Sequence, residues 1–238
     1  MKYEKIVSGI FIDRPNRFIA HVEIEGKTET VHVKNTGRCK ELLLPGSKVI
    51  LEDFRNRPEG KNRKTKFDLI AVYKILEKNS VLKSPLLINM DSQAPNKVVK
   101  EWLLKQDYSF VKSEYCFGQS RIDFYMERNC RKGSEKEKWL LEIKGCTLEK
   151  GGKGYFPDAP TQRGVKHLKE LTEACKKGWK CAAGFVIQME GVNEVLANVE
   201  THAEFGMALE NARKNGVEVW FLLCKTGEDF LEIIEKRC

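Results

Sequence analysis

Three ionisable residues between Gly118 and Gly145 could together cleave a phosphate ester. Asp123, Glu142 and Lys144 each lie in a short apolar segment that is typical of a strand. A charged group inside a buried strand is unfavourable unless it has a partner or a catalytic role. Two carboxylates with room for water suit Mg²⁺, and a lysine beside them can stabilise negative charge in a transition state. The residue types therefore predict a metal-dependent nuclease site.

Strand geometry decides whether these three side chains can meet. Because side chains alternate between the two faces of a strand, Glu142 and Lys144 point to the same side. If the two segments pair as a hairpin, Asp123 can lie beside Glu142. A bound metal would lower the pKa of a water molecule, and Lys144 would orient that water or stabilise the transition state. The alternative is an exposed strand that carries a Glu-x-Lys pair for solubility.

A second group of polar residues follows on a predicted helix. The glycine-rich stretch after Lys144 predicts a loop, and Pro160 followed by Thr161 predicts a helix start. The inward face of this helix has Val165, Leu168 and Leu171, and the opposite face has Arg163, Lys166, His167 and Glu170. The two cations would clamp a phosphate near the helix N-terminus. The imidazole of His167 would give a proton to the leaving oxygen of the phosphate ester or act as a neutral hydrogen-bonding group. The alternative is a solvated face with a local His167–Glu170 pair.

Composition sets the class of protein in which these residues lie. The chain has 238 residues, 41% hydrophobic and 32% charged, with a formal net charge of +8. The basic excess favours a polyanionic partner, with nucleic acid as the obvious choice. There is no signal-peptide core at the N-terminus and no apolar run long enough for a membrane span. The eight cysteines, Cys130 among them, form no Cys-x-x-Cys pair. They predict reduced thiols and a cytoplasmic protein, with a disulfide framework as the alternative.

Residues 1–82 are predicted to form a small β-barrel of the oligonucleotide-binding (OB) type. About five short strands alternate with polar turns, including a basic loop at residues 55–66. The cations that could follow a phosphate backbone are Arg14, Arg17, Arg38, Arg63, Lys64 and Lys66. Phe11, Phe18 or Phe54 could stack on bases, although barrel core is the alternative for each ring and a solvated hairpin tip is the alternative for the loop.

Residues 83–238 are predicted to form an α/β sandwich with a mixed central sheet. Asn96 would cap a helix whose apolar stripe includes Val98 and Leu103, and Glu101 would lie on its surface. A buried strand at residues 181–188 follows the helix that begins at Pro160. A capping box at residues 201–204 predicts a further helix to about residue 215, and residues 217–223 read as a last buried strand. The overall fold class is therefore α/β, or α+β when the barrel is included.

Four segments carry a resemblance to a known family over nearly the whole chain. They are RPNRF at residues 14–18, NTGR at 35–38, GQSRIDF at 118–124 and FPDAPTQRGVKHLKEL at 156–171. Together they resemble the sugar fermentation stimulation protein (SfsA) family. The resemblance implies an OB-like domain followed by a PD-(D/E)xK nuclease-like domain, and DNA binding with nuclease activity on DNA and RNA. Asp123 would bind the metal, and Glu142 with Lys144 would be the (D/E)xK pair.

The resemblance also assigns accessory residues. Glu101 matches the acidic residue that many such nucleases carry on the helix before the sheet, and Glu114 is its competitor. Gln188 falls where related nucleases place a polar residue after the core strand. Arg121 joins the nucleic-acid-binding residues, and Asp158 is a further accessory candidate. The chain departs from the family pattern at Gly145-Cys146. The PD dipeptide is also absent before Asp123, which follows Arg121-Ile122, and the Pro157-Asp158 pair comes only after the Glu-x-Lys.

These observations predict a protein that binds DNA or RNA and hydrolyses phosphodiester bonds with Mg²⁺ or Mn²⁺. One alternative is a DNA-binding regulator of sugar (maltose) metabolism with a vestigial nuclease core. Another is a module that binds a small phosphorylated ligand on Arg163 and Lys166. The sequence leaves the oligomeric state open, with a homodimer as one option.

Overall fold

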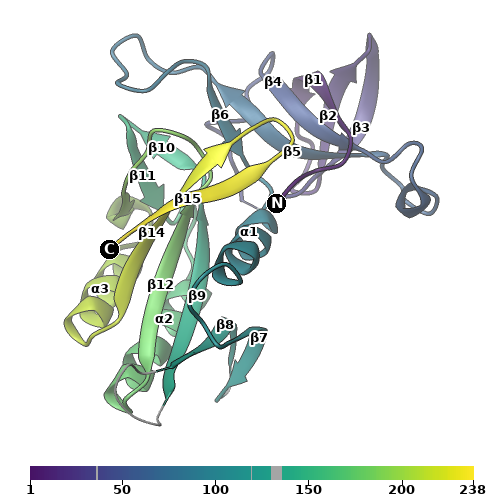
Figure 1. Cartoon of the computed structure of the whole chain (residues 1–238). Coiled ribbons are helices and arrows are strands. Elements are labelled where there is room, and N and C mark those ends of the chain that lie inside the picture. Colours follow the sequence, from purple (N-terminus) through teal and green to yellow (C-terminus); the bar gives the residue numbers. More distant parts are fainter. Residues whose placement is uncertain (36, 119, 130–135) are drawn as a thin grey trace.

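The first unit of the computed structural model is a β-barrel (Figure 1). The structure describes residues 1–35, 37–118, 120–129 and 136–238. The barrel strands are β1 (Ile6–Asp13), β2 (Ile19–Ile24), β3 (Lys27–Val33), β4 (Lys48–Asp53), β5 (Phe67–Lys74) and β6 (Leu86–Asn89), with a short helix η1 (Pro58–Gly60) after β4. Their order is β3-β2-β1-β4-β5-β6, and a further pairing of β3 with β5 closes the barrel, as predicted. The sheet continues through β6, beyond the predicted boundary at residue 82.

Strand periodicity explains the barrel core. In β2, Ala20, Val22 and Ile24 are fully or almost fully buried and alternate with more exposed residues, as expected for a sheet with one face in a core. Phe11 and Phe54 are also buried, so the barrel-core alternative is correct for both rings. Phe18 is 55% exposed, and it alone of these three aromatic residues is free to stack on a base.

The second unit is an α/β sandwich with a mixed central sheet, which confirms the predicted fold class. Its sheet consists of β7 (Phe110–Phe117), β8 (Ser120–Asn129), β9 (Lys136–Cys146), β12 (Lys180–Ile187), β14 (Glu218–Thr226) and β15 (Leu231–Arg237), in the order β15-β14-β12-β9-β8-β7. Strands β9, β12 and β14 run parallel, and the outer strands run antiparallel to their neighbours. A small sheet of β10 (Leu148–Lys150), β11 (Lys153–Phe156) and β13 (Val195–Ala197) lies beside it.

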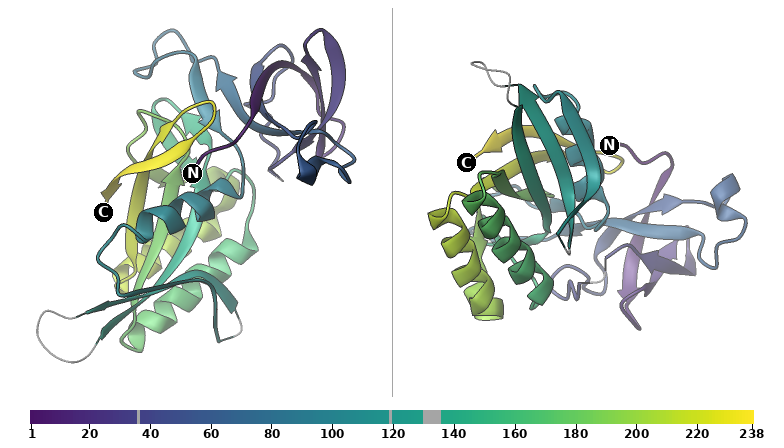
Figure 2. Two further views of the ribbon diagram at one scale, coloured as in Figure 1. Left: turned by 45° about the vertical axis from the view of Figure 1, so that its right-hand side comes forward. Right: turned by 90° about the horizontal axis from the view of Figure 1, so that it is seen from below.

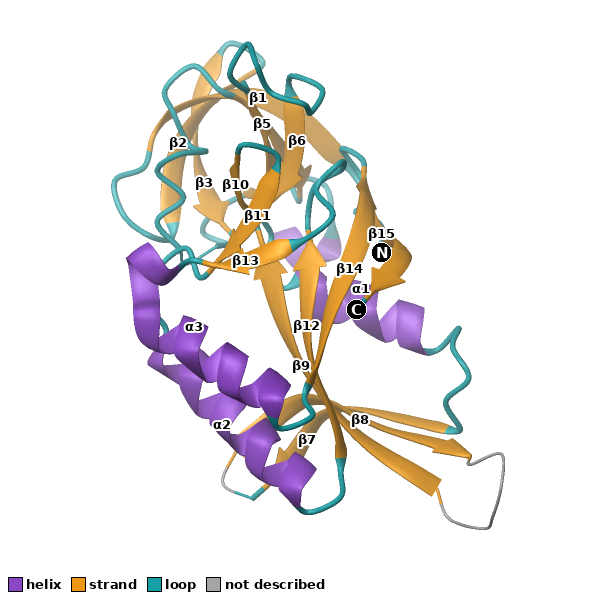
Figure 3. Cartoon of the chain, turned by 90° about the vertical axis from the view of Figure 1, so that its left-hand side faces the viewer, coloured by secondary structure: helices purple, strands orange, loops and turns teal. Residues whose placement is uncertain are grey.

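The helices cover opposite faces of the central sheet. Helix α1 (Ala94–Leu103) lies on one face, and α2 (Gln162–Lys176) and α3 (Val199–Lys214) lie side by side on the other (Figures 2 and 3). Leu141 and Ile143 of β9 belong to the core under α1, whereas Leu140 belongs to the core under α2 and α3. By strand alternation, Glu142 must point toward α2. The face toward which Glu142 points determines which helix supplies its hydrogen-bond partners.

Helix starts differ in part from the predictions. Thr161 caps α2 as predicted, and its Oγ1 accepts a hydrogen bond from Gly164 N at 3.1 Å. The prediction that Asn96 caps α1 is wrong, because the helix begins at Ala94 and Asn96 lies within it. Helix α3 begins at Val199, before the predicted capping box, and is kinked at His202.

The cysteines in the described residues are free thiols. Cys130 and the charged connection at residues 130–135 lie outside the described residues. None of the helices in the described part of the chain has the length and apolar character that crossing a bilayer requires.

Candidate active site

Strands β8 and β9 separate at the point where the predicted catalytic residues lie. Their antiparallel pairing runs from Asn129–Lys136 to Phe124–Leu141. Beyond this point, the Asp123 carboxylate takes the place of a backbone partner, and its Oδ2 accepts a hydrogen bond from Ile143 N at 2.7 Å. The predicted hairpin pairing is therefore present, and it brings Asp123 next to the Glu-x-Lys strand.

Glu142 is the centre of a buried polar cluster. The residue is 3% exposed, and its Oε1 accepts hydrogen bonds from Lys144 Nζ at 2.5 Å and from His167 Nδ1. His167 Nε2 lies 3.4 Å from Arg163 Nε, which can only donate. The imidazole therefore accepts at Nε2 and donates at Nδ1, a neutral form that both partners fix. Glu142 Oε2 is buried and has no hydrogen-bond partner among the described residues.

This cluster corrects the predicted position of His167. The imidazole does not lie on the solvated face of α2 with Glu170, because it is 4% exposed and reaches across to β9. Glu170 instead accepts a hydrogen bond from Ser120 Oγ at 2.6 Å and forms an ion pair with Lys166 at 3.7 Å. The alternative of a local His167–Glu170 pair is therefore wrong. Glu170 ties α2 to Ser120 of β8, and Glu142 of β9 ties that strand to His167 of α2.

The two carboxylates differ in their electrostatic environment. Burial and the nearby charge of Glu142 raise the pKa of Asp123, against the opposing effects of Ile143 N, Lys144 and Asn96. Burial also opposes ionisation of Glu142, but the His167 hydrogen bond and the Lys144 charge outweigh it and lower the pKa of Glu142. A cation between the two groups would offset the repulsion that raises the pKa of Asp123.

The donor set fits a hard divalent cation in part. The unpartnered Glu142 Oε2 and the adjacent Asp123 supply carboxylate oxygens, which Mg²⁺ prefers, and Mg²⁺ keeps several waters in sites of one or two carboxylates. No group of three or more His, Cys, Asp or Glu side chains within the described residues is arranged around a common metal position. The remaining ligands would therefore have to be water, backbone or substrate oxygens.

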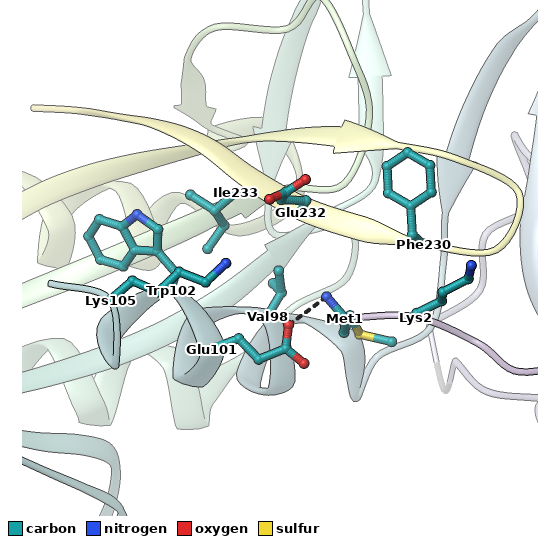
Figure 4. Close-up of a pocket in the computed structure, with 9 residues that line it drawn as sticks. All are labelled: Met1, Lys2, Val98, Glu101, Trp102, Lys105, Phe230, Glu232 and Ile233. Carbon is teal, nitrogen blue, oxygen red and sulfur yellow. Dashed lines mark ion pairs between the residues drawn. The ribbon is translucent and has the colours of Figure 1, made fainter.

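Two further acids proposed as ligands lie elsewhere. The carboxylate of Glu101 is directed to the amino group of Met1 at 2.7 Å, beside Trp102 and β15 (Figure 4). Glu114, on β7, is exposed and lies 3.8 Å from Arg121. The residue of α1 that does reach the site is Asn96, whose Nδ2 donates to Asp123 Oδ1 at 2.8 Å.

Basic side chains surround a hollow beside the buried cluster. Arg121, Arg163 and Lys166 line it together with Ser120, Gln162 and His167, and its volume is about 550 Å³. Arg121 is exposed at the start of β8, and Arg163 and Lys166 are exposed on the first turns of α2. The predicted phosphate clamp thus lies next to His167, the partner of Glu142.

The cations predicted on the barrel divide into two groups. Arg14 donates to the backbone carbonyls of Arg17, Asn35, Gly37 and Arg38, so its guanidinium holds a loop together. Arg63 pairs with Asp68, and Lys66 Nζ donates to Gly60 O at 2.7 Å. Arg17, Arg38 and Lys64 are exposed. Within the described residues, Arg17, Arg38 and Lys64 make no side-chain contact that a phosphate backbone would have to break.

Gln188 and Asp158 both lie where the two units meet. Gln188 Nε2 donates to Asn89 Oδ1 at 3.0 Å and to Asp91 O at 3.2 Å, so this buried amide joins β12 to the end of the barrel sheet. Asp158 faces the barrel loop at Gly37. Surrounding protein atoms raise the pKa of Asp158 by desolvation, although the residue as a whole is exposed.

Sequence reasoning missed two residues of the site. Asn96 holds Asp123, and Ser120 holds Glu170. Neither has a sequence signal for this role, because each contact joins elements that only the tertiary fold brings together.

Comparison with known proteins agrees with this two-unit architecture. Residues 12–81 match the SfsA N-terminal OB domain, and residues 93–230 match the sugar fermentation stimulation protein RE domain. A sugar fermentation stimulation protein homolog of Ruminiclostridium cellulolyticum is 48% identical, with 98% of this chain and 96% of the relative covered. One of Desulfitobacterium hafniense is also 48% identical, covering 98% and 95%.

A solved structure shares the whole fold. The Pyrococcus furiosus SfsA structure in complex with Ca²⁺ superposes with a TM-score of 0.78 at 23% identity and covers 99% of this chain and 96% of that one. With both domain matches and full-length relatives near half identity, the chain belongs to the sugar fermentation stimulation protein family.

Proposed function

We propose that this protein is a nuclease that hydrolyses phosphodiester bonds of DNA or RNA with Mg²⁺ or Mn²⁺. The observation that carries the proposal is the meeting of Asp123, Glu142 and Lys144 where β8 and β9 separate, with Glu142 Oε2 buried and unpartnered. The Ca²⁺ complex of the Pyrococcus furiosus relative supports a divalent cation in this family. The free thiols support a cytoplasmic location.

The residues of the site divide the work of hydrolysis. A bound divalent cation would supply an activated water and would screen the charge of the phosphate. Asn96 and Ile143 N hold Asp123, and His167 holds Glu142, so both carboxylates have fixed positions. Lys144 places an ammonium next to Glu142, where it can stabilise the additional negative charge of the transition state.

His167 acts in this proposal as a positioning residue for Glu142. Because its Nδ1 donates to Glu142 and its Nε2 accepts from Arg163, it has no free proton for a leaving group. We expect His167→Leu to lower the cleavage rate by roughly ten- to a hundredfold, the value of a hydrogen bond to a charged group. His167→Asn, whose amide can still donate to Glu142, should retain most activity. If the asparagine variant is as slow as the leucine variant while both melt like the parent protein, His167 would have to be reassigned as the proton donor to the leaving oxygen.

Arg163 should contribute to affinity for the nucleic acid backbone. It is exposed on the first turn of α2, beside the hollow that Arg121 and Lys166 also line. We expect Arg163→Ala to weaken binding several-fold and to make the log–log salt dependence shallower by about 0.7 on single strands, the value of one phosphate contact. Arg213→Ala, an exposed arginine in the last turn of α3, is the matched control and should leave the slope unchanged. Equal slopes for the two variants would mean that no phosphate lies at Arg163.

The decisive experiment is a titration of Mg²⁺ and Mn²⁺ against cleavage of labelled single- and double-stranded DNA and RNA. The proposal predicts cleavage that chelation stops and that either metal restores. Tight binding without cleavage at any metal concentration would contradict it and would favour a DNA-binding regulator. Binding of a sugar phosphate that single-stranded DNA does not displace would instead favour a module for a small phosphorylated ligand.

A further inference from the structure

A cavity of about 310 Å³ lies where the barrel meets the second unit. Segments far apart in the chain form its walls, and the polar residues among them include Asn35, Ser92, Thr147, Asp158, Thr161 and Gln188. The volume is at the lower end for ligand pockets. It suits one nucleobase and is too small for a base pair.

Three residues that line the cavity are close chain neighbours of candidate-site residues. Its lining includes Gly145, which directly follows Lys144, and Pro95, which directly precedes the Asp123 partner Asn96. Thr161, the N-cap of α2, is a third lining residue, and Arg163 follows it by two positions. The cavity is therefore joined to the candidate site through the backbone of β9, α1 and the start of α2.

The charges of the cavity exclude phosphate. Among the described residues, those that line it include Asp158 but no lysine or arginine. The neighbouring hollow has the opposite character, with Arg121, Arg163 and Lys166 around it. A phosphate would be repelled by the carboxylate and attracted to the cations. The cavity thus suits a neutral group that donates hydrogen bonds.

Two glycines keep the polar atoms of the cavity accessible. A Cβ on Gly37 would lie 2.4 Å from Asp158 Oδ2 and 2.9 Å from Asn35 Oδ1. A Cβ on Gly145 would lie 2.4 Å from Gln188 Oε1. The loop that contains Gly37 is also held in place, because Arg14 donates to its carbonyls at 2.7 to 2.9 Å. No side chain among the described residues hydrogen-bonds to the carboxylate of Asp158. Its hydrogen bonds come from the backbone N–H groups of Asp158 and Ala159, and a carboxylate with about four lone-pair sites can accept further donors.

We infer that this cavity recognises a nucleobase next to the bond that is cleaved, and that it prefers guanine. The inference rests on the proposed function. A carboxylate pairs best with two parallel donors, and guanine has two adjacent N–H donors on its Watson–Crick edge. Thymine has a single N–H donor between two carbonyl oxygens, which the carboxylate repels. An unpaired base that enters a pocket is typically read at this edge.

Binding to single strands in EDTA tests this inference without cleavage. The probes are four labelled short oligothymidine strands. Three carry one central guanine, adenine or cytosine, and the fourth contains thymine only. Fluorescence anisotropy gives the dissociation constants. We expect the wild-type protein to bind the guanine strand about tenfold more tightly than the all-thymine strand, within the range of one bidentate pair. Asp158→Asn should remove most of this ratio, since its amide repels one of the two donors.

Glu41→Gln is the matched control. Burial raises the pKa of the Cys39 thiol to about 12, and the carboxylates of both Asp158 and Glu41 add to the shift, so both acids lie in the same region. Glu41 does not line the cavity, and its variant should keep the guanine preference. Gly37→Ala, which keeps Asp158 but crowds it, should lose the preference as well.

Three results would overturn the inference. The first is equal affinity of the wild-type protein for all four strands, and the second is a guanine preference that survives Asp158→Asn. The third is discrimination between these strands and ribose strands of the same sequence with no dependence on the base, which would assign Asp158 to the sugar. Because metal and cleavage play no part, a failure of the proposed nuclease activity would appear separately.

Discussion

Replacing Glu142 by glutamine should lower metal-dependent cleavage by about a thousandfold or more. The substitution removes the anionic Oε2 that is buried without a partner and weakens the acceptor for Lys144 and His167. Loss of metal-assisted charge stabilisation costs several kcal/mol, and roughly 1.4 kcal/mol corresponds to each factor of ten in rate. Asp123→Asn should have a similar effect on cleavage. Single-turnover rates at saturating Mg²⁺, compared with the parent protein, give the measurement.

The two variants should differ in thermal stability. The raised pKa of Asp123 means that folding disfavours its ionised form, so a neutral amide should leave the melting temperature unchanged or higher. Asn96 can rotate its amide to offer an acceptor to the new side chain. The lowered pKa of Glu142 means that folding favours its ionised form, so glutamine there should lower the melting temperature. The same direction of shift in both variants would contradict this electrostatic description.

Glu101→Gln is the control that distinguishes the site from the general acidity of the region. Glu101 pairs with the amino group of Met1 and does not contact the Asp123 and Glu142 cluster. We expect full cleavage from this variant, with unchanged affinity for nucleic acid in EDTA. A large loss of activity would restore Glu101 as a metal ligand and would require α1 to move when metal binds.

Strand patterns made the fold and part of the site predictable from sequence. Alternation placed Glu142 and Lys144 on the same side of β9, and the apolar segments around Asp123 predicted its pairing with that strand. Such inferences succeed because periodicity of side chains is a local property of the backbone. The start of α2 at Thr161 was predictable for the same reason, since a cap uses backbone groups within the same turn.

Side-chain partners were not predictable, because they depend on which helix covers which face of the sheet. His167 contacts Glu142 only because α2 packs against the face toward which Glu142 points. Arg14 was expected to meet phosphate, yet four backbone carbonyls use its donors. An arginine in a loop looks the same in sequence whether it binds a ligand or holds the loop closed. The tertiary structure separates these two roles.

Replacing Lys144 by alanine should slow cleavage by about a hundredfold or more, while the affinity for nucleic acid in EDTA changes little. Its ammonium is buried to a large extent and is held 2.5 Å from Glu142 Oε1, so it is positioned before substrate arrives. Removal of one preorganised electrostatic contact in a transition state typically costs this much. The measurement is the single-turnover rate across a Mg²⁺ titration, in which the half-saturating metal concentration should stay close to the parent value.

Lys138→Ala is the matched control for Lys144→Ala, because Lys138 lies on the same strand but is exposed. It should cleave at the parent rate, which would exclude a general effect of lost positive charge on β9. If Lys144→Ala instead raises the half-saturating Mg²⁺ concentration and reaches the parent rate at high metal, Lys144 acts only on Glu142 and the metal. A rate that stays low at all metal concentrations requires that Lys144 act on the reacting phosphate or water, because saturating metal cannot replace a charge that stabilises the transition state directly.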